Sequence, residues 1–333
     1  MTAGLMPRHG RGATSTPRTD RSGLLALDKP AGITSHDAVD RVRRRLRIRA
    51  AGHLGTLDPG ATGLLLVATG AATRCAPVWQ GGDKTYEASI LFGIVTASQD
   101  VHGEILERRE VNLDEARVRE AALALTGEQE QIPPMVSAIK VGGERLYRLA
   151  RRGLEVERAP RRITVREWEW LGFELPAARF RIVCSGGTYV RTLAHDLGQR
   201  LGCGAALSAL RRSRSEPFGL DRAVPLADLD RLEGDEVWSR AGYSLEEALA
   251  HLPTVRLDGD GAVAIGYGTR PAVPESAMAG VPREAGPRSV VFRGPDDRVI
   301  ALGEIVREAP DSARSLACPH VVFPWALRQG KPL

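Results

Sequence analysis

The residues whose types and spacing could best support a reaction lie in the string GHLGTLDPGATG, at residues 52–63. Asp58 stands there in a loop rich in Gly and Pro, directly before the apolar run LLLVA. A carboxylate held in a tight loop can act as a nucleophile, a general base or a metal ligand, but Asp and Pro are also ordinary turn residues. His53 is the one possible metal ligand near Asp58 in the sequence, because no carboxylate and no pair of histidines stands close by. Taken alone, the string favours a turn.

Other motifs that carry chemistry are missing from the chain. It contains neither G-x-x-x-x-G-K-[ST] nor a G-x-G-x-x-G that follows a strand, so we expect neither ATP nor NAD. Its four cysteines are widely separated and form no CxxC or CxxH cluster of the kind that binds zinc. We therefore expect small buried hydrophobic residues, with neither disulfides nor metal, at Cys75, Cys184, Cys203 and Cys318.

The elements that must position Asp58 can be read from apolar spacing. The run GLLALD predicts a strand that ends at Pro30, and Ser35 is expected to cap a helix. That helix carries apolar residues at helical spacing, namely Ala38, Val39, Val42 and Leu46. The period-two alternation in 84–93 predicts a strand with one buried face.

Further along the chain, residues 113–126 predict a helix that Gly127 ends. Residues 178–185 alternate again, and an apolar helical stripe follows from Val190 to Leu201. This pattern indicates a strand, a turn and a helix. The segment 221–250 is acidic and helical in pattern. Short apolar runs after 251, separated by Gly, Pro and Asp, are typical of a small β-rich module.

The charge of the chain is small overall but unevenly distributed. The 333 residues carry 46 basic and 41 acidic side chains, a net charge of +5, and all but four of the basic residues are arginine. Six arginines fall within 41–49 and seven within 145–162. Such a cluster can be a solvated face or a surface that contacts phosphate, because the guanidinium fork pairs well with phosphate oxygens. Residues 1–22 are predicted to form a disordered basic tail.

A composition of 43% hydrophobic residues allows a sizeable core. No apolar run reaches the ~20 residues that a membrane-spanning helix needs, so we expect no membrane partner. The N-terminal residues lack the apolar core of a secretion signal, which makes the cytoplasm the expected location.

The string GHLGTLDPGATG closely resembles the catalytic motif GH-x-G-x-LDP-x-A-x-G of the TruB family of tRNA pseudouridine synthases. The segments LLALDKPAGITSHDAV, KTYEA, QIPPMVSAIK, GGTYVRTLAHDLG and LSALRRSRSEPF are similar to family segments in the same order. The resemblance is strong over about 23–220.

This resemblance implies a fold and a domain organisation. The fold class would be α+β, with a mixed, largely antiparallel sheet flanked by helices and an active-site cleft across its middle. Residues 23–252 would form the catalytic domain, with a basic RNA-gripping insertion at about 128–162. Residues 253–333 would form a small RNA-binding module similar to a PUA domain.

The resemblance also implies roles for individual residues. Asp58 would be the nucleophile that attacks the ribose or forms the covalent adduct. Tyr86 would stack on the target base and assist removal of a proton from the sugar. Tyr189 and Arg191 would line the pocket, with Arg191 paired to the Asp58 carboxylate. Asp100 matches a second acid that holds this arginine.

Three further positions match family residues around the pocket. Leu210 would pack near the base, although a plain core role is equally open. His53 would wedge into the T-loop as the uridine turns out. Lys29 would support the nearby loop or contact RNA. Ala97 and Val136 depart from the family pattern, where an acid and an aromatic residue are common.

The function implied is conversion of uridine 55 in the T-loop of tRNA into pseudouridine. Because the product is an isomer, no cofactor is required; the expected partner is the T-arm of tRNA, and we expect a monomer. The alternatives are a guide-RNA-dependent synthase of the box H/ACA type and a tRNA-binding folding chaperone that does not require catalysis. A hydrolase or metal enzyme is a third alternative.

Overall fold

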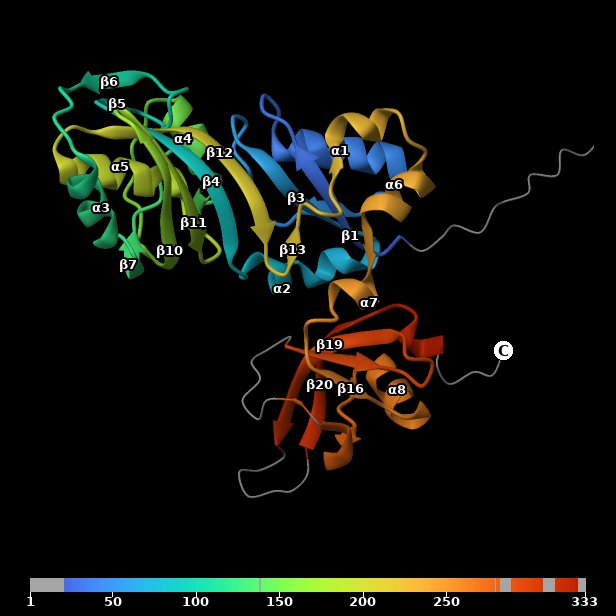
Figure 1. Ribbon diagram of the computed structural model, residues 1–333. Coiled ribbons are helices and arrows are strands. Elements are labelled where there is room, and N and C mark those ends of the chain that lie inside the picture. Colours follow the sequence, from blue (N-terminus) through green and yellow to red (C-terminus); the bar gives the residue numbers. More distant parts are fainter. Residues whose placement is uncertain (1–20, 138, 279, 282–288, 308–314, 329–333) are drawn as a thin grey trace, which may run out of the picture.

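The computed structural model describes residues 21–137, 139–278, 280–281, 289–307 and 315–328 (Figure 1). It confirms the predicted α+β class, since a large mixed sheet is covered by helices and a second, smaller sheet follows. Nearly all of the predicted N-terminal tail, residues 1–20, lies outside the described residues. None of the described helices is long and apolar enough to cross a membrane.

Eight strands follow one another across the main sheet. Their order is β14 (Val224–Pro225), β1 (Gly23–Lys29), β3 (Thr62–Thr69), β12 (Ala205–Ser215), β4 (Lys84–Phe92), β11 (Ala177–Cys184), β10 (Arg161–Glu174) and β7 (Gly127–Gln131). Neighbours in this order are antiparallel except for two parallel pairs, β1 with β14 and β3 with β12. Short strands pair beside it: β2 (Ala51–His53), β13 (Phe218–Gly219) and β15 (Gly242–Ser244).

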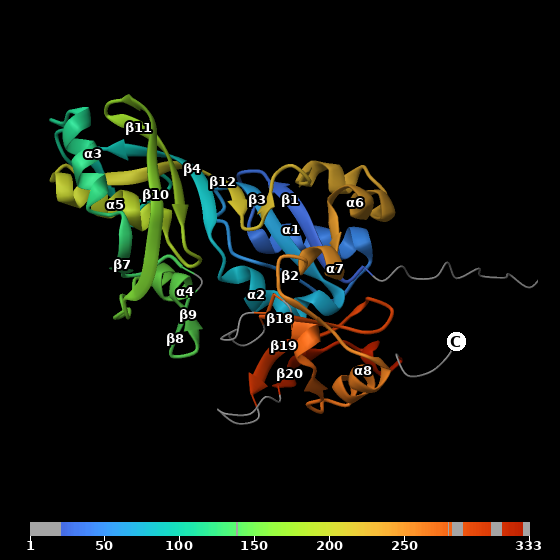
Figure 2. The same cartoon turned by 60° about the horizontal axis from the view of Figure 1, so that its bottom comes forward.

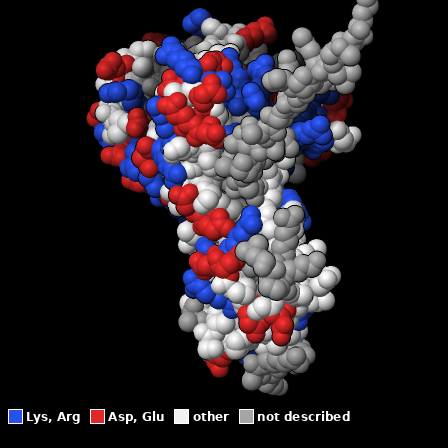
Figure 3. Space-filling model, turned by 90° about the vertical axis from the view of Figure 1, so that its right-hand side faces the viewer, with Lys and Arg blue, Asp and Glu red and all other residues white. Residues whose placement is uncertain are grey.

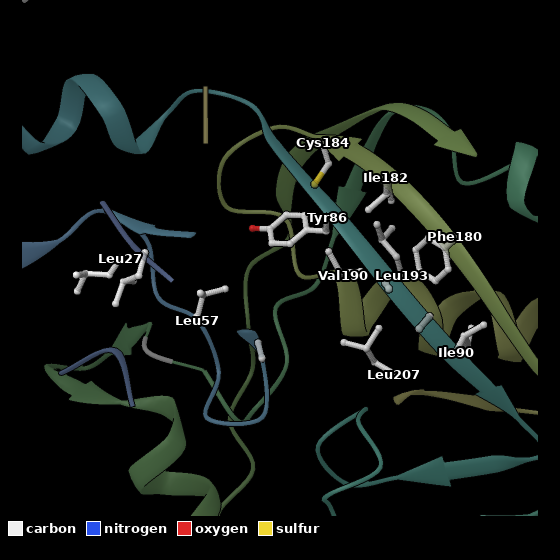
Figure 4. Close-up of a cluster of buried hydrophobic side chains, with 14 of the residues drawn as sticks. Leu27, Leu57, Tyr86, Ile90, Phe180, Ile182, Cys184, Val190, Leu193 and Leu207 are labelled. Atoms are coloured by element: carbon white, nitrogen blue, oxygen red, sulfur yellow. The ribbon is translucent and has the colours of Figure 1, made fainter. Parts of the chain in front are cut away.

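Successive side chains of a strand point to opposite faces of a sheet. At β1 and β3 both faces of the main sheet are buried, whereas β4 and β11 bury one face. On β1, Leu25 and Leu27 pack on one side and Leu24 and Ala26 on the other. The first side is covered by helices α1 (Ser35–Leu46), α3 (Glu115–Leu123), α5 (Val190–Leu201) and α6 (Gly234–Ala241). Figure 4 shows part of this cluster, with Val190 and Leu193 of α5 facing the strand side chains.

The second side of the sheet is covered by shorter elements and by the C-terminal module. Trp79 of α2 (Ala76–Gln80) and Leu245 of α7 (Leu245–Ala248) pack there beside Val299 and Phe323. The 3-10 turn η1 (Gly70–Cys75) completes this half, whereas η2 (Leu226–Asp230) packs on the first side through Leu226 and Leu229. The same apolar cluster thus contains strands of the large sheet and strands of the small one.

The C-terminal module contains the β-rich pattern that the sequence predicts. Its five strands follow the order β16 (Thr254–Arg256), β18 (Val290–Arg293), β19 (Val299–Arg307), β20 (Ser315–Val322) and β17 (Ala272–Val273). Helix α8 (Gly259–Gly266) and the 3-10 turns η3 (Glu275–Met278) and η4 (Ala326–Arg328) complete it. This small sheet, with one α-helix among the described residues of the module, is compatible with a PUA-like fold.

Most of the predicted elements form where the apolar spacing places them. The strands at 84–93 and 178–185 and the helix after Val190 are confirmed as β4, β11 and α5. The segment 221–250 is only partly helical, since β14 and β15 lie within it. All four cysteines are buried with free thiols, as predicted.

The predicted helix cap is wrong by one residue. The N-cap of α1 is Thr34, whose hydroxyl accepts a hydrogen bond from the Asp37 amide in a capping box. Ser35 instead lies buried at the first helical position, where its hydroxyl contacts Leu57. The helix predicted at 113–126 is shorter at both ends and has Asp114 as its N-cap.

The predicted boundaries of the basic insertion include parts of the main sheet. Residues Gly127–Gln131 form β7, which pairs antiparallel with the start of β10, so that Arg161 lies opposite Gln131. The segment between them holds β8 (Lys140–Val141), β9 (Glu144–Arg145) and α4 (Leu146–Arg151). Figure 2 shows these three elements projecting away from the sheet. Elsewhere, β5 (Ile94–Thr96) and β6 (Ile105–Arg108) form a separate hairpin.

Candidate active site

Asp58 lies in the loop between β2 and β3, and contacts from two elements fix that loop. The Ser35 hydroxyl accepts a hydrogen bond from the Leu57 amide at 2.9 Å and donates one to the Leu57 carbonyl at 3.0 Å. The Gly32 amide donates to the Pro59 carbonyl at 2.8 Å. The start of α1 and the segment after β1 therefore hold the residues on either side of Asp58.

Lys29 supports the same loop through hydrogen bonds to backbone carbonyls. Its side chain is fully buried, and Nζ donates to the carbonyls of Pro30 and Ile33 at 2.9 Å and of Pro59 at 3.4 Å. Burial lowers the pKa of Lys29 to about 8, although the Asp58 charge opposes this effect. Of the two predicted roles, loop support fits these contacts.

The Asp58 carboxylate faces the guanidinium of Arg191. Nε of Arg191 lies 3.2 Å from Oδ2, and Nη2 donates to Oδ1 at 3.3 Å. Arg191 comes from α5 and is almost fully buried, and it also donates to the carbonyls of Ser98 and Val136 at 3.2 and 2.6 Å. Burial raises the pKa of Asp58, while the adjacent guanidinium lowers it. The predicted pairing of these two residues is present.

Asp58 and Arg191 line an inner cavity of about 210 Å³ together with Tyr86, Tyr189 and Leu210. Tyr86 extends from β4, and Figure 4 shows its hydroxyl pointing away from the core around Cys184, towards the side of Leu57. Burial raises the pKa of both tyrosines, so their hydroxyls carry a proton at neutral pH. The cavity thus combines one carboxylate, two phenols and an apolar wall.

Tyr189 is held by a residue that the sequence analysis did not single out. Gln131, buried at the end of β7, accepts a hydrogen bond from the Tyr189 amide at 2.8 Å and donates to the Tyr189 carbonyl at 3.1 Å. The base of the insertion is therefore tied to the start of α5, and a polar strand with no apolar run gave no signal of this contact.

A larger cavity of about 730 Å³ lies on the other side of Asp58. Its walls come from β4, β12 and the loop after Asp58, and Asp58 and Leu210 line both cavities. Asp100 and His102 face the larger one. Leu210 is half-buried between the two, so it is part of a cavity wall as well as of the core.

Asp100 makes contacts that differ from the expected one. Its Oδ1 accepts hydrogen bonds from the Ser98 hydroxyl at 2.8 Å and from the His102 amide at 3.0 Å. Within the described ranges no hydrogen bond or ion pair joins Asp100 to Arg191. The link runs through Ser98, whose carbonyl accepts from Arg191. Asp100 therefore shapes the turn that supports the arginine.

His53 is the predicted site residue that lies apart from the others. It ends β2, is half-buried, and lines neither cavity. Its Nδ1 is buried with no hydrogen-bond partner in the described part of the chain. Burial and the charge of Arg212 lower its pKa, which favours the neutral imidazole.

Two buried cations in the inner cavity were missed from the sequence. Lys84 begins β4, and its Nζ donates to the carbonyls of Gln80 and Gly82. Arg212 on β12 is 1% exposed. Both occur in motif segments, KTYEA and LSALRRSRSEPF, but a basic residue on an alternating strand gives no sign of which face it occupies. The departure at Val136 contacts Arg191 through its carbonyl, which any residue supplies.

Comparisons with known proteins identify relatives of this chain. Residues 43–190 match the family described as TruB family pseudouridylate synthase (N terminal domain). Residues 191–251 match the tRNA pseudouridylate synthase B C-terminal domain.

Individual relatives agree with these matches. The tRNA pseudouridine synthase B of Aromatoleum aromaticum is 47% identical over 238 residues, which cover 71% of this chain and 76% of that protein. The protein of the same name from Geobacter sulfurreducens is 43% identical over 286 residues, with 85% and 93% covered. Among solved structures, a chain of the crystal structure of a Cbf5-Nop10-Gar1 complex is similar with a TM-score of 0.70 and 29% identity, covering 94% of this chain and 88% of that chain.

Proposed function

Because this chain belongs to the TruB family of pseudouridine synthases, we propose that it converts uridine 55 in the T-loop of tRNA into pseudouridine. The observation that carries the proposal is the Asp58 carboxylate held against Arg191 at the edge of a cavity that also contains Tyr86. The relatives named tRNA pseudouridine synthase B support tRNA as the substrate.

In this proposal Asp58 acts as the nucleophile while the C1′–N1 bond of the uridine breaks. The freed uracil turns within the inner cavity and rejoins the ribose through C5, so that no atom is gained or lost. Arg191 favours the ionised carboxylate that the attack requires. Tyr86 stacks on the base and assists proton removal from the sugar, and Leu210 and Tyr189 limit the space in which the base turns.

The uridine must leave the stack of the T-loop to reach Asp58, because C1′ and C5 are not accessible in a stacked loop. We assign His53 to the space that the base vacates. Its lowered pKa supports this role, since a neutral imidazole can stack among bases without a charge to solvate. His53 is the last residue of β2, so in this proposal the end of that strand faces the T-loop.

Arginine-rich surfaces supply the grip on the T-arm. Arg145 and Arg148 are exposed on the projecting insertion, and Arg44 and Arg47 are exposed at the end of α1. Figure 3, viewed from the side of α1 and α6, shows acidic groups interspersed with the basic ones there. For that reason we assign the insertion the larger share of phosphate contacts. A monomer in the cytoplasm, with a catalytic domain at 23–252 and an RNA-binding module at 253–333, completes the proposal.

The decisive experiment replaces one carboxylate. Asp58→Asn keeps the shape of the side chain and removes the nucleophile, so we expect isomerisation of an unmodified tRNA transcript to stop while tRNA binding persists. Glu236→Gln, on the exposed face of α6, is the matched control and should leave the rate unchanged. Unchanged isomerisation by the Asp58 variant would refute the assignment of the nucleophile. Pseudouridine mapping at single-nucleotide resolution then names the position modified.

The guide-dependent and chaperone alternatives give different results in the same assay. A guide-dependent enzyme would modify the transcript only when a guide RNA is added, whereas we expect the purified chain to act alone. The higher identity to tRNA pseudouridine synthase B proteins, 43–47% against 29% for the Cbf5 complex chain, supports the stand-alone form. A chaperone would accelerate tRNA folding and leave uridine 55 unmodified.

A further inference from the structure

Arg212 is a buried cation with an unusual environment. It is 1% exposed, and within the described ranges no carboxylate lies within ion-pair distance of its guanidinium. Arginine stays charged at any pH that proteins tolerate, and an uncompensated buried charge is costly. Because such a residue is retained at a cost in stability, its position points to a use.

The fold places Arg212 between the strand that follows Asp58 and the strand that carries Tyr86. β12 lies between β3 and β4, and Arg212 is opposite Tyr86 on β4 and opposite Gly63 on β3. Cross-strand partners project on the same face of a sheet. The side chain of Arg212 therefore leaves the sheet beside that of Tyr86, and both line the inner cavity.

Two hydrogen bonds fix the orientation of the guanidinium. Nε donates to the Leu64 carbonyl at 2.7 Å, and Nη2 donates to the Gly55 carbonyl at 3.1 Å. Gly55 precedes Asp58 and Leu64 follows it, so the arginine also joins the two ends of the Asp58 loop.

The charge of the guanidinium acts on Tyr86. Burial raises the pKa of Tyr86, and the charge of Arg212 opposes that rise. The same charge lowers the pKa of Lys84, after burial. Arg212 is thus a source of positive potential at the end of the cavity where the Tyr86 hydroxyl lies.

We propose that Arg212 is the positioning residue of Tyr86, with its guanidinium held on the carbonyls of Gly55 and Leu64 and donating to the tyrosine hydroxyl. An oxygen that accepts this hydrogen bond directs its own proton and its remaining lone pair into the cavity. The inference adds a residue to the proposed function and rests on it only for the part that Tyr86 plays in the reaction.

Single-turnover kinetics on a tRNA transcript test the proposal. Arg212→Gln should slow isomerisation by about 100-fold, the scale of a misplaced reacting group. Arg212→Lys retains the charge but loses the planar fork, so it should be almost as slow. The dissociation constant for tRNA should change less than threefold in both variants. Arg214→Gln on the same strand, whose side chain is half-exposed and pairs with Glu216, is the control and should match the unaltered chain.

A double-mutant cycle separates positioning from a structural effect. In a Tyr86→Phe background there is no hydroxyl to position, so Arg212→Lys should slow the reaction less than threefold further. An equal loss in both backgrounds, or a loss of tRNA binding that accounts for the whole effect, would overturn the proposal. Melting temperatures of each variant show which of them are folded.

A measurement without substrate keeps the inference separate from the proposed function. The chain has five tyrosines, so ¹³Cζ labelling gives five signals, and Tyr86→Phe identifies one of them. Arg212→Lys should shift the Tyr86 signal and leave the other four in place. An unmoved Tyr86 signal would refute the contact. If the unaltered chain fails to modify any tRNA, the proposed function falls, but this spectrum still decides the inference.

Discussion

Asp58 combines two opposing influences in one side chain. Burial favours its neutral form, and the guanidinium of Arg191 favours the carboxylate that can act as a nucleophile. The ion pair therefore decides the pH at which the site becomes active. Activity should fall on the acid side as Asp58 takes up a proton.

This balance gives the first prediction. Removing the guanidinium in Arg191→Gln leaves burial unopposed, so the pKa of Asp58 rises further and the acid limb of the kcat/KM profile moves to higher pH. Arg200→Gln, near the end of the same helix, is the control. The rate should also fall, because Arg191 donates hydrogen bonds to the carbonyls of Ser98 and Val136. The position of the acid limb depends only on the ion pair with Asp58. A limb that stays in place would show that another group limits activity at low pH.

The sequence predicted the pairing of Asp58 with Arg191 across 133 positions, since each residue stands in its own family segment. It did not predict Arg212. Two register shifts interrupt β12, one of them between Arg212 and Arg214, and they break the alternation that would show which arginine faces inward. The family motif predicts that Asp100 lies near Arg191, but it does not show that the link between them runs through Ser98.

At the level of elements, apolar spacing predicted the strands and helices that carry an apolar stripe. It failed for β7, whose sequence GEQEQ has no apolar side chain and pairs at the edge of the sheet. The boundaries of the insertion were therefore placed inside the sheet. It also misplaced the cap of α1, because Thr34 and Ser35 are both good capping residues and only the fold shows which one faces the Leu57 backbone.

These two adjacent residues make a matched pair for the second prediction. Ser35→Ala removes both hydrogen bonds to Leu57, so it should lower the rate by about tenfold and lower the free energy of unfolding by about 1–3 kcal/mol, because buried groups lose their partner. Thr34→Ala removes the cap and should cost about 1 kcal/mol with little change in rate. Chemical denaturation and single-turnover kinetics measure the two effects. Equal effects on rate would mean that α1 supports the loop only through its overall stability.

The insertion provides the third prediction. Arg145 and Arg148 are exposed on β9 and α4, away from the cavities. Replacing both by Gln should weaken tRNA binding and make the plot of log affinity against log salt shallower by about 1 for each phosphate that is no longer neutralised. Arg119→Gln on α3 removes the same kind of charge elsewhere on the molecule and should leave the slope unchanged. A slope that is unaffected by the insertion variant would place the phosphate-binding groups on another surface.

At the scale of the whole molecule, the two sheets share an apolar cluster. Strand residues Leu64 and Leu66 of the large sheet pack in the same cluster as Val299 and Phe323 of the small one. The Arg74 guanidinium donates to the Val322 carbonyl, and the Val299 amide donates to the Glu246 carboxylate. Composition alone indicated a boundary near 253, but it could not show that the module beyond it completes the core before it.

The fourth prediction follows from this shared core. A chain that ends at 252 lacks the partners of Leu64 and Leu66, so it should melt at a lower temperature, bind more of a dye that reports exposed apolar surface, and aggregate at lower concentration. Val299→Asp in the full chain, which buries a charge in the same cluster, should act in the same direction. Weakened tRNA binding by the shortened chain would then reflect reduced stability as well as a smaller RNA-binding surface. A shortened chain that melts like the full one would show instead that the large sheet closes its own core, and that the module serves RNA alone.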